Sequence, residues 1–171
     1  MNKRTKRYIL SYVLLVAAYI LQTTLIGRTA VFGVTPSLLL IMVVCFSLVN
    51  DYVPSCTFGV VTGFLLDISS GRVLGFNAIL MMYLALGVVS AGQEFFRDTG
   101  RSAAFLVVIC TIVYETVFSF FNFSIFGNGA FWYMLVRMIL VEALYNGIVA
   151  IPVYLLFKNT LKIKTGHSLF D

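Results

Sequence analysis

The sequence predicts an all-α, polytopic membrane protein with six transmembrane helices. Three observations lead to this prediction. The 171-residue chain is 60% hydrophobic and only 11% charged, which is more apolar surface than a soluble domain of this length could bury. Six long apolar runs alternate with short polar segments. Basic residues gather at the ends of alternate runs, as in the cytoplasmic loops of membrane proteins. Residues 1–171 are therefore expected to form a single integral membrane domain.

The apolar runs define the expected helices in order. They are residues 8–26, 36–49, 53–66, 75–91, 102–123 and 131–157. The second and third runs have 14 residues each, fewer than the roughly 20 that cross a bilayer as an ideal helix. Residues 36–66 can therefore form two short spans beside thinned bilayer or one re-entrant pair. Both alternatives leave every later loop on the same side of the membrane.

The distribution of basic residues favours six crossings with both termini in the cytoplasm. In that topology only Arg28 and Arg72 lie in outer loops, whereas nine basic residues lie in cytoplasmic segments. The nine are Lys3, Arg4, Lys6, Arg7, Arg97, Arg101, Lys158, Lys162 and Lys164. Five crossings would place more basic residues outside than inside, contrary to the positive-inside rule. The expected cytoplasmic tails are residues 1–7 and 158–171.

One glycine-spaced segment stands out from the ordinary membrane-helix composition. Gly59 and Gly63 are four residues apart, a spacing that lets two helices approach closely in lipid. Asp67 follows on the same run, and because a carboxylate is costly in hydrocarbon it is expected at a helix end, in protein or in water. The docking helix can belong to this chain or to a partner. The helix-packing and partner-interface candidates are Gly59, Gly63, Asp67, Gly71, Gly75 and Asn77.

Polar residues recur inside the last two apolar runs. Glu115 lies near mid-membrane in the fifth run, and Arg137 and Glu142 fall close to its depth in the sixth. An Arg137–Glu115 ion pair, or two glutamates sharing a proton, is geometrically possible. Such a network either relays protons or substrate or holds packed helices in register, and the second interpretation is favoured. Its candidate members are Glu115, Asn122, Arg137, Glu142 and Asn146.

The chain offers little for catalysis or metal binding. Cys45, Cys56 and Cys110 lie in apolar runs without the spacing of metal ligands, and His167 is the single histidine. Asp67 is near two serines in the sequence, but no base accompanies them. We therefore expect no enzyme activity, no catalytic or metal site and no cofactor, and we expect the basic N-terminus to serve the membrane and not nucleic acid.

Several short motifs follow one another along the chain. They are Pro36-Ser-Leu-Leu-Leu-Ile41, Gly59-x-x-x-Gly63-Phe-Leu-Leu-Asp67, Leu74-Gly-Phe-Asn-Ala78, Glu142-x-x-Tyr-Asn146 and Ile151-Pro-Val-Tyr154. Together, in this order and with this hydropathy, they resemble the family of the rod shape-determining protein MreD over essentially the whole chain.

The resemblance implies a non-enzymatic scaffold of the cell-elongation (rod) complex in the bacterial inner membrane. The implied partner is MreC, a single-span protein, through which the family supports a RodA-type glycan polymerase, a class B penicillin-binding transpeptidase and, indirectly, an MreB-like filament. It also implies a fold like the substrate-binding membrane subunit of energy-coupling-factor transporters. The alternative function is therefore a membrane substrate-binding subunit for a small, vitamin-type molecule.

Overall fold

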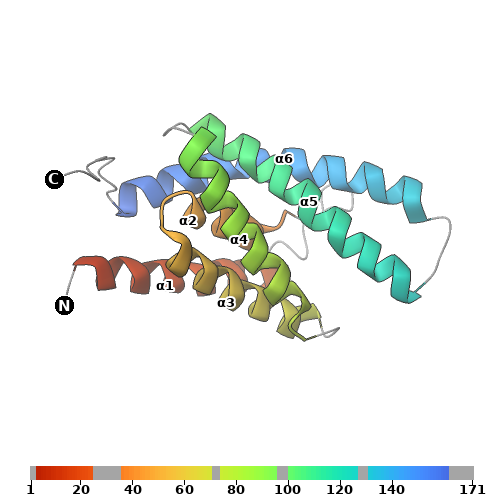
Figure 1. Ribbon diagram of the computed structural model, residues 1–171, viewed down its shortest axis with the longest axis horizontal. Helices are drawn as coiled ribbons and strands as arrows, with labels where there is room; N and C mark the ends of the chain where they lie inside the picture. Colours follow the sequence, from red (N-terminus) through yellow and green to blue (C-terminus); the bar gives the residue numbers. More distant parts are fainter. Residues whose placement is uncertain (1–2, 25–35, 71–73, 96–99, 127–130, 162–171) are drawn as a thin grey trace.

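The computed structural model describes residues 3–24, 36–70, 74–95, 100–126 and 131–161. Six helices follow one another in the expected order, which confirms the prediction of an all-helical chain with six helices. They are α1 (Lys3–Thr24), α2 (Leu38–Ser47), α3 (Tyr52–Ser70), α4 (Phe76–Phe95), α5 (Gly100–Phe126) and α6 (Phe131–Leu161). The start of α1 and the end of α6 lie at the same end of the long axis (Figure 1).

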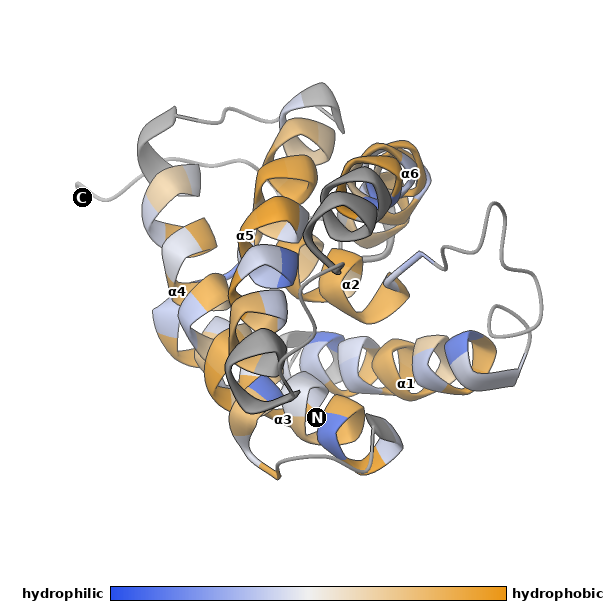
Figure 2. Cartoon of the chain, turned by 90° about the vertical axis from the view of Figure 1, so that its right-hand side faces the viewer, coloured by the Kyte–Doolittle hydropathy of each residue, from blue (hydrophilic) through white to orange (hydrophobic). Residues whose placement is uncertain are grey.

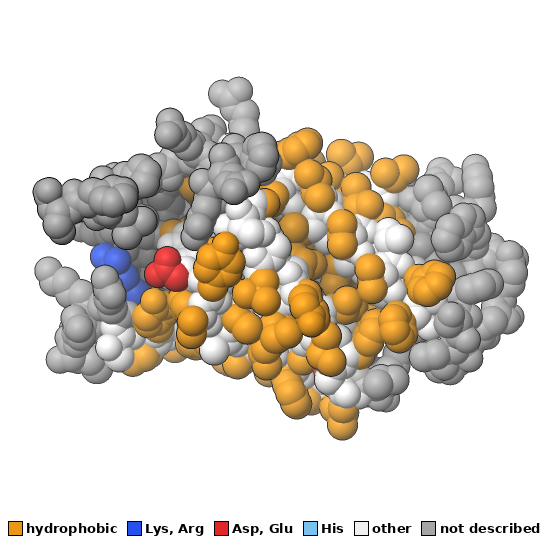
Figure 3. All heavy atoms as spheres, viewed as in Figure 1, with side chains coloured by type: hydrophobic (Ala, Val, Ile, Leu, Met, Phe, Trp, Pro, Cys, Tyr) orange, Lys and Arg blue, Asp and Glu red, His pale blue; other side chains and the backbone are white. Residues whose placement is uncertain are grey.

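The outer surface of the bundle suits a lipid solvent. Among the described residues, four helices are long and apolar enough to cross a membrane, namely α1, α3, α5 and α6. Large apolar side chains point outward, including Val53 and Ile148, which are 75% and 69% exposed. Hydrophobic side chains cover much of the described surface in Figure 3. Because hydrocarbon solvates such side chains as well as protein does, their exposure carries little cost in a bilayer.

Helix α2 is even shorter than the apolar run from which it was predicted. It has 10 residues, about 15 Å of helix, which is half of a hydrocarbon core of roughly 30 Å. Residues 39–47 are all buried, whereas α3 has 19 residues. A helix enclosed by protein need not reach both membrane surfaces if the backbone amides and carbonyls at its ends are hydrogen-bonded to other parts of the protein. The two apolar runs of equal length therefore form helices of unequal length. Six complete crossings remain a prediction.

The core is organised around α2, which contacts each of the other five helices. Its Phe46 ring stacks on Phe58 of α3, with ring centroids 4.1 Å apart. Phe157 of α6 meets Phe46 edge-on at 6.4 Å, and Tyr12 of α1 lies 5.4 Å from Phe58. These aromatic contacts join four helices to one another through three buried rings and the half-buried ring of Tyr12.

Two helical hairpins account for the most extensive helix contacts. Helices α3 and α4 form the first, and α5 and α6 form the second. Seen along the bundle, the two pairs occupy different sides, and α2 lies between α1 and α6 (Figure 2). The direct contact between α4 and α5 is far smaller than the contact within either hairpin.

Candidate functional site

Gly59 and Gly63 lie where α3 meets α4 most closely, and both are buried. A Cβ atom on Gly59 would lie 2.7 Å from the carbonyl oxygen of Met81. A Cβ atom on Gly63 would overlap the Cα of Ala78 and the carbonyl oxygen of Asn77. These neighbours belong to the backbone, so they cannot rotate away as a side chain can. The helix that docks on the glycine face is therefore α4 of the same chain.

Asp67 is buried in the last turn of α3 and caps the N-terminus of α4. Its Oδ2 accepts hydrogen bonds from the amides of Gly75 at 2.8 Å and Ala78 at 3.4 Å. Its Oδ1 accepts one from the amide of Asn77 at 3.1 Å. The first amides of a helix have no partner within it and carry the positive end of the helix dipole, so a carboxylate is well placed there. The aspartate does lie at a helix end, but α3 itself continues to Ser70.

Gly75 has a backbone role in the same cap. Its φ angle is +94°, a conformation that side chains with a Cβ rarely adopt. No atom lies within 4 Å of the position of its missing Cβ, so the backbone angle and not close packing favours glycine here. Gly71, the other glycine expected in this turn, lies outside the described residues.

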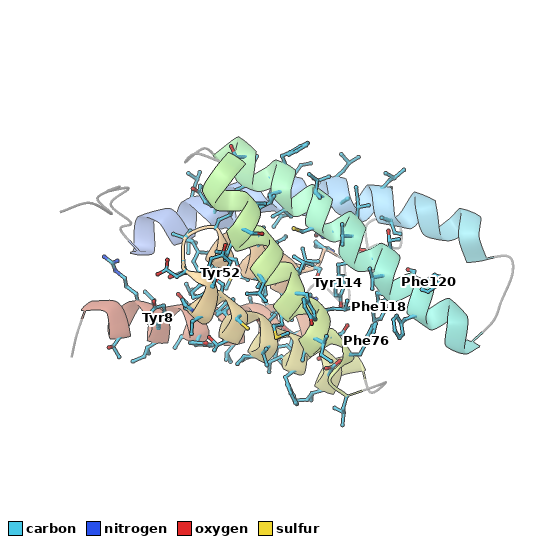
Figure 4. The ribbon with its side chains drawn as sticks, viewed as in Figure 1. Tyr8, Tyr52, Phe76, Tyr114, Phe118 and Phe120 are labelled. Atoms are coloured by element: carbon cyan, nitrogen blue, oxygen red, sulfur yellow. The ribbon has the colours of Figure 1, made fainter. Side chains whose placement is uncertain are left out.

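Asn77 extends the cap to α5. Its backbone amide bonds Asp67, and its side-chain Oδ1 accepts a hydrogen bond of 2.9 Å from the hydroxyl of Tyr114. Both side chains are buried, and Figure 4 shows Tyr114 in the same region as Phe76 and Phe118. One chain of polar contacts thus joins α3, α4 and α5. Sequence reasoning missed Tyr114, although a tyrosine inside an apolar helix signals a hydroxyl in need of a partner.

Asn146 links α6 to neighbouring helices by side-chain hydrogen bonds. It is fully buried, accepts a hydrogen bond of 3.0 Å from the amide of Ser37 and donates one of 3.2 Å to the Thr111 hydroxyl oxygen. It therefore joins α6 to α5 and to the start of α2. The next residue, Gly147, lies close to α5, because a Cβ there would be 2.8 Å from Cγ2 of Val108. Sequence reasoning missed Ser37 and Gly147 as parts of this contact.

We expect Asn146→Leu to destabilise the protein, because leucine has a similar size but cannot bond the Ser37 amide. A buried amide left without a partner costs about 1–3 kcal/mol. Thermal unfolding in mild detergent would measure the loss, with Thr116→Val as the matched control. Thr116 is exposed, and its hydroxyl donates a hydrogen bond to the Ile112 carbonyl of its own helix. Equal unfolding temperatures for the two variants would contradict the expectation.

Glu115 and Glu142 flank this contact on facing helices. Glu115 lies one turn after Thr111 and Glu142 one turn before Asn146, and both side chains are half-buried. The side chains of Asn122 and Arg137 lie outside the described ones, so the Arg137–Glu115 ion pair stays a prediction.

The fold and these contacts define a helical membrane protein whose buried polar groups join its helices. The family model of the rod shape-determining protein MreD matches residues 3–163. The chain therefore belongs to the MreD family, which confirms the resemblance and implies a role in rod shape determination. No curated protein and no solved structure matched the chain, so the likeness to the energy-coupling-factor subunit fold stays a prediction.

Proposed function

We propose that the protein is a non-enzymatic scaffold of the cell-elongation complex in the bacterial inner membrane. The observation that supports a scaffold is the use made of its buried polar groups. Asp67, Asn77 and Asn146 all bond neighbouring helices. Hydrogen bonds of this kind hold neighbouring helices in defined contacts, as a body on which partners dock requires. Together with membership of the MreD family, this favours a scaffold over the vitamin-type carrier.

The proposed direct partner is an MreC-like single-span protein. Through it the scaffold would support peptidoglycan synthesis by a RodA-type glycan polymerase and a class B penicillin-binding transpeptidase, and would be linked indirectly to an MreB-like filament. Affinity purification of the tagged full-length protein in mild detergent tests this proposal. Recovery of the MreC-like protein with the polymerase would support it. Recovery of ATPase subunits instead would favour the carrier and overturn it.

The proposed topology has six crossings with both termini in the cytoplasm. The start of α1, the connection between α2 and α3, the end of α4 and the end of α6 lie toward one end of the long axis in Figure 1. Six of the nine basic residues that the sequence assigns to the cytoplasm belong to the described helices near this end, namely Lys3, Arg4, Lys6 and Arg7 of α1, Arg101 of α5 and Lys158 of α6. Their gathering on one side agrees with the positive-inside rule.

Cysteine labelling tests this topology in a background without the three native cysteines. We expect an impermeant maleimide added from outside to label cysteines introduced next to Arg28, Arg72 and Asn128. A cysteine next to Lys164 should react only after the membrane is permeabilised, because the tail is cytoplasmic. Labelling of that position in intact cells would disprove the topology.

A scaffold and a proton-coupled carrier differ in what they require of Glu115 and Glu142. In a scaffold, Glu115→Gln and Glu142→Gln should each preserve rod shape in a deletion strain, because glutamine keeps the volume and most of the hydrogen-bonding capacity. Arg137→Ala should be more harmful if Arg137 pairs with Glu115, because a carboxylate would then lose its partner. Cell shape and membrane protein level are measured together. A glutamine variant present at normal level that fails to restore rod shape would contradict the purely structural role.

A further inference from the structure

The two hairpins are each held together in the same way. In the first, Gly59 and Gly63 bring the backbones of α3 and α4 together and Asp67 bonds the start of α4. In the second, Gly147 brings α6 close to α5, and Asn146 bonds Thr111 across the contact. Buried hydrogen bonds and close helix contacts of this kind are costly to break. We therefore expect each hairpin to move as one body.

The two hairpins are in direct contact at the start of α4. There the Asn77 side chain accepts the hydrogen bond of Tyr114. The neighbouring Phe76 ring lies 4.6 Å from that of Phe121 and 6.2 Å from that of Phe118. Figure 4 shows Phe76, Tyr114 and Phe118 together toward the α3–α4 connection. This polar and aromatic contact ties the start of α4 to the second half of α5.

Beside this contact, an apolar groove of about 390 Å³ lies between the two helices, and Tyr114 is among the residues that line it. Its walls include Leu84, Gly87 and Ala91 from α4, and Leu106 and Ile109 from α5. Gly87 has no atom within 4 Å of the position of a Cβ, so α5 does not press on it. The groove walls carry few polar groups, so changing its width breaks few hydrogen bonds. Because lipid chains solvate apolar side chains as well as protein does, opening the groove costs little.

We propose that the α3–α4 and α5–α6 hairpins rock against each other about the Asn77–Tyr114 contact, which changes the width of the α4–α5 groove. The buried helix α2 lies against both hairpins. Its first amides are bonded by Asn146 of α6 and Gln22 of α1, so α2 stays with the α5–α6 hairpin. All but one of its ten residues are apolar, so small sliding of the α3–α4 hairpin along it is opposed by apolar contacts. Hinge and shear movements of packed helices are a common form of conformational change. The inference does not depend on the identity of the protein's partners.

Spin-label distance measurements on the full-length protein in lipid nanodiscs test the hinge. One label pair, at the exposed positions Ser90 and Phe105, reports across the groove between α4 and α5. A second pair, at the exposed positions Val53 and Ile79, reports within the α3–α4 hairpin. The native cysteines are replaced by alanine. Each pair is measured with Tyr114 intact and as Tyr114→Phe, which removes the hydroxyl but keeps the ring that stacks on Phe118.

We expect Tyr114→Phe to broaden the distance distribution across the groove and shift it to longer distances, while the distribution within the hairpin stays the same. Thr116→Val, on the exposed face of the same helix, should change neither distribution. An unchanged distribution across the groove in Tyr114→Phe would overturn the hinge. Equal broadening of both label pairs would also overturn it, because that result indicates general loosening of the fold.

Discussion

Gly63→Ala is expected to disrupt the α3–α4 hairpin, although it adds a single methyl group. The new Cβ would overlap the Cα of Ala78 and the carbonyl oxygen of Asn77, so α4 would have to move as a whole. Overpacking a tight contact costs about 1–3 kcal/mol, and more where the neighbours cannot move. Moving α4 would also pull its first amides away from Asp67. We therefore expect a large fall in thermal stability and in the amount of protein in the membrane.

Gly87→Ala is the matched control for this substitution. Gly87 lies on α4, is exposed, and has open space where a Cβ would be placed. Alanine also favours the helix over glycine by up to about 1 kcal/mol, so this variant should be as stable as the original protein or slightly more so. Unfolding temperatures in detergent and protein levels in membranes compare the two. If Gly63→Ala were as stable as Gly87→Ala, the close contact between α3 and α4 would be wrong.

Asp67→Asn is expected to have the second large effect. The carboxylate receives three backbone amides on its two oxygens, whereas asparagine offers one accepting oxygen and an amide group that donates. In either orientation of the asparagine, at least one helix amide faces another donor. Each buried amide without a partner costs about 1–3 kcal/mol. Asp67→Ala removes all three bonds, and we expect it to lose about 3 kcal/mol or more.

The control for the cap is Asp51→Asn. Asp51 is exposed immediately before α3, where asparagine and aspartate are similarly favourable before a helix. Thermal unfolding should therefore rank the proteins with Asp51→Asn close to the original, Asp67→Asn clearly lower and Asp67→Ala lowest. A stability for Asp67→Asn equal to that of Asp51→Asn would show that the cap contributes little.

Much of the fold could be predicted from local sequence because a lipid environment restricts which secondary structure an apolar run can adopt. In hydrocarbon every backbone amide must be paired within the protein, so a long apolar run becomes a helix. The six runs accordingly appear as six helices in the same order. The spacing of Gly59 and Gly63 also predicted a close helix contact, since the four-residue interval places both on one helix face. These are properties of residues near one another in the chain.

The tertiary structure alone decided which groups meet across the chain. That α4 is the helix on the glycine face, that Asp67 caps α4 and not α3, and that Tyr114 reaches Asn77 all join residues on different helices. The short, buried α2 is a similar case, because the side chains of Asn146 and Gln22, on α6 and α1, bond the amides at its N-terminus. Hydropathy and spacing report where each helix lies in the sequence. They carry no information on which helix faces which, because that choice depends on the packing of all six together.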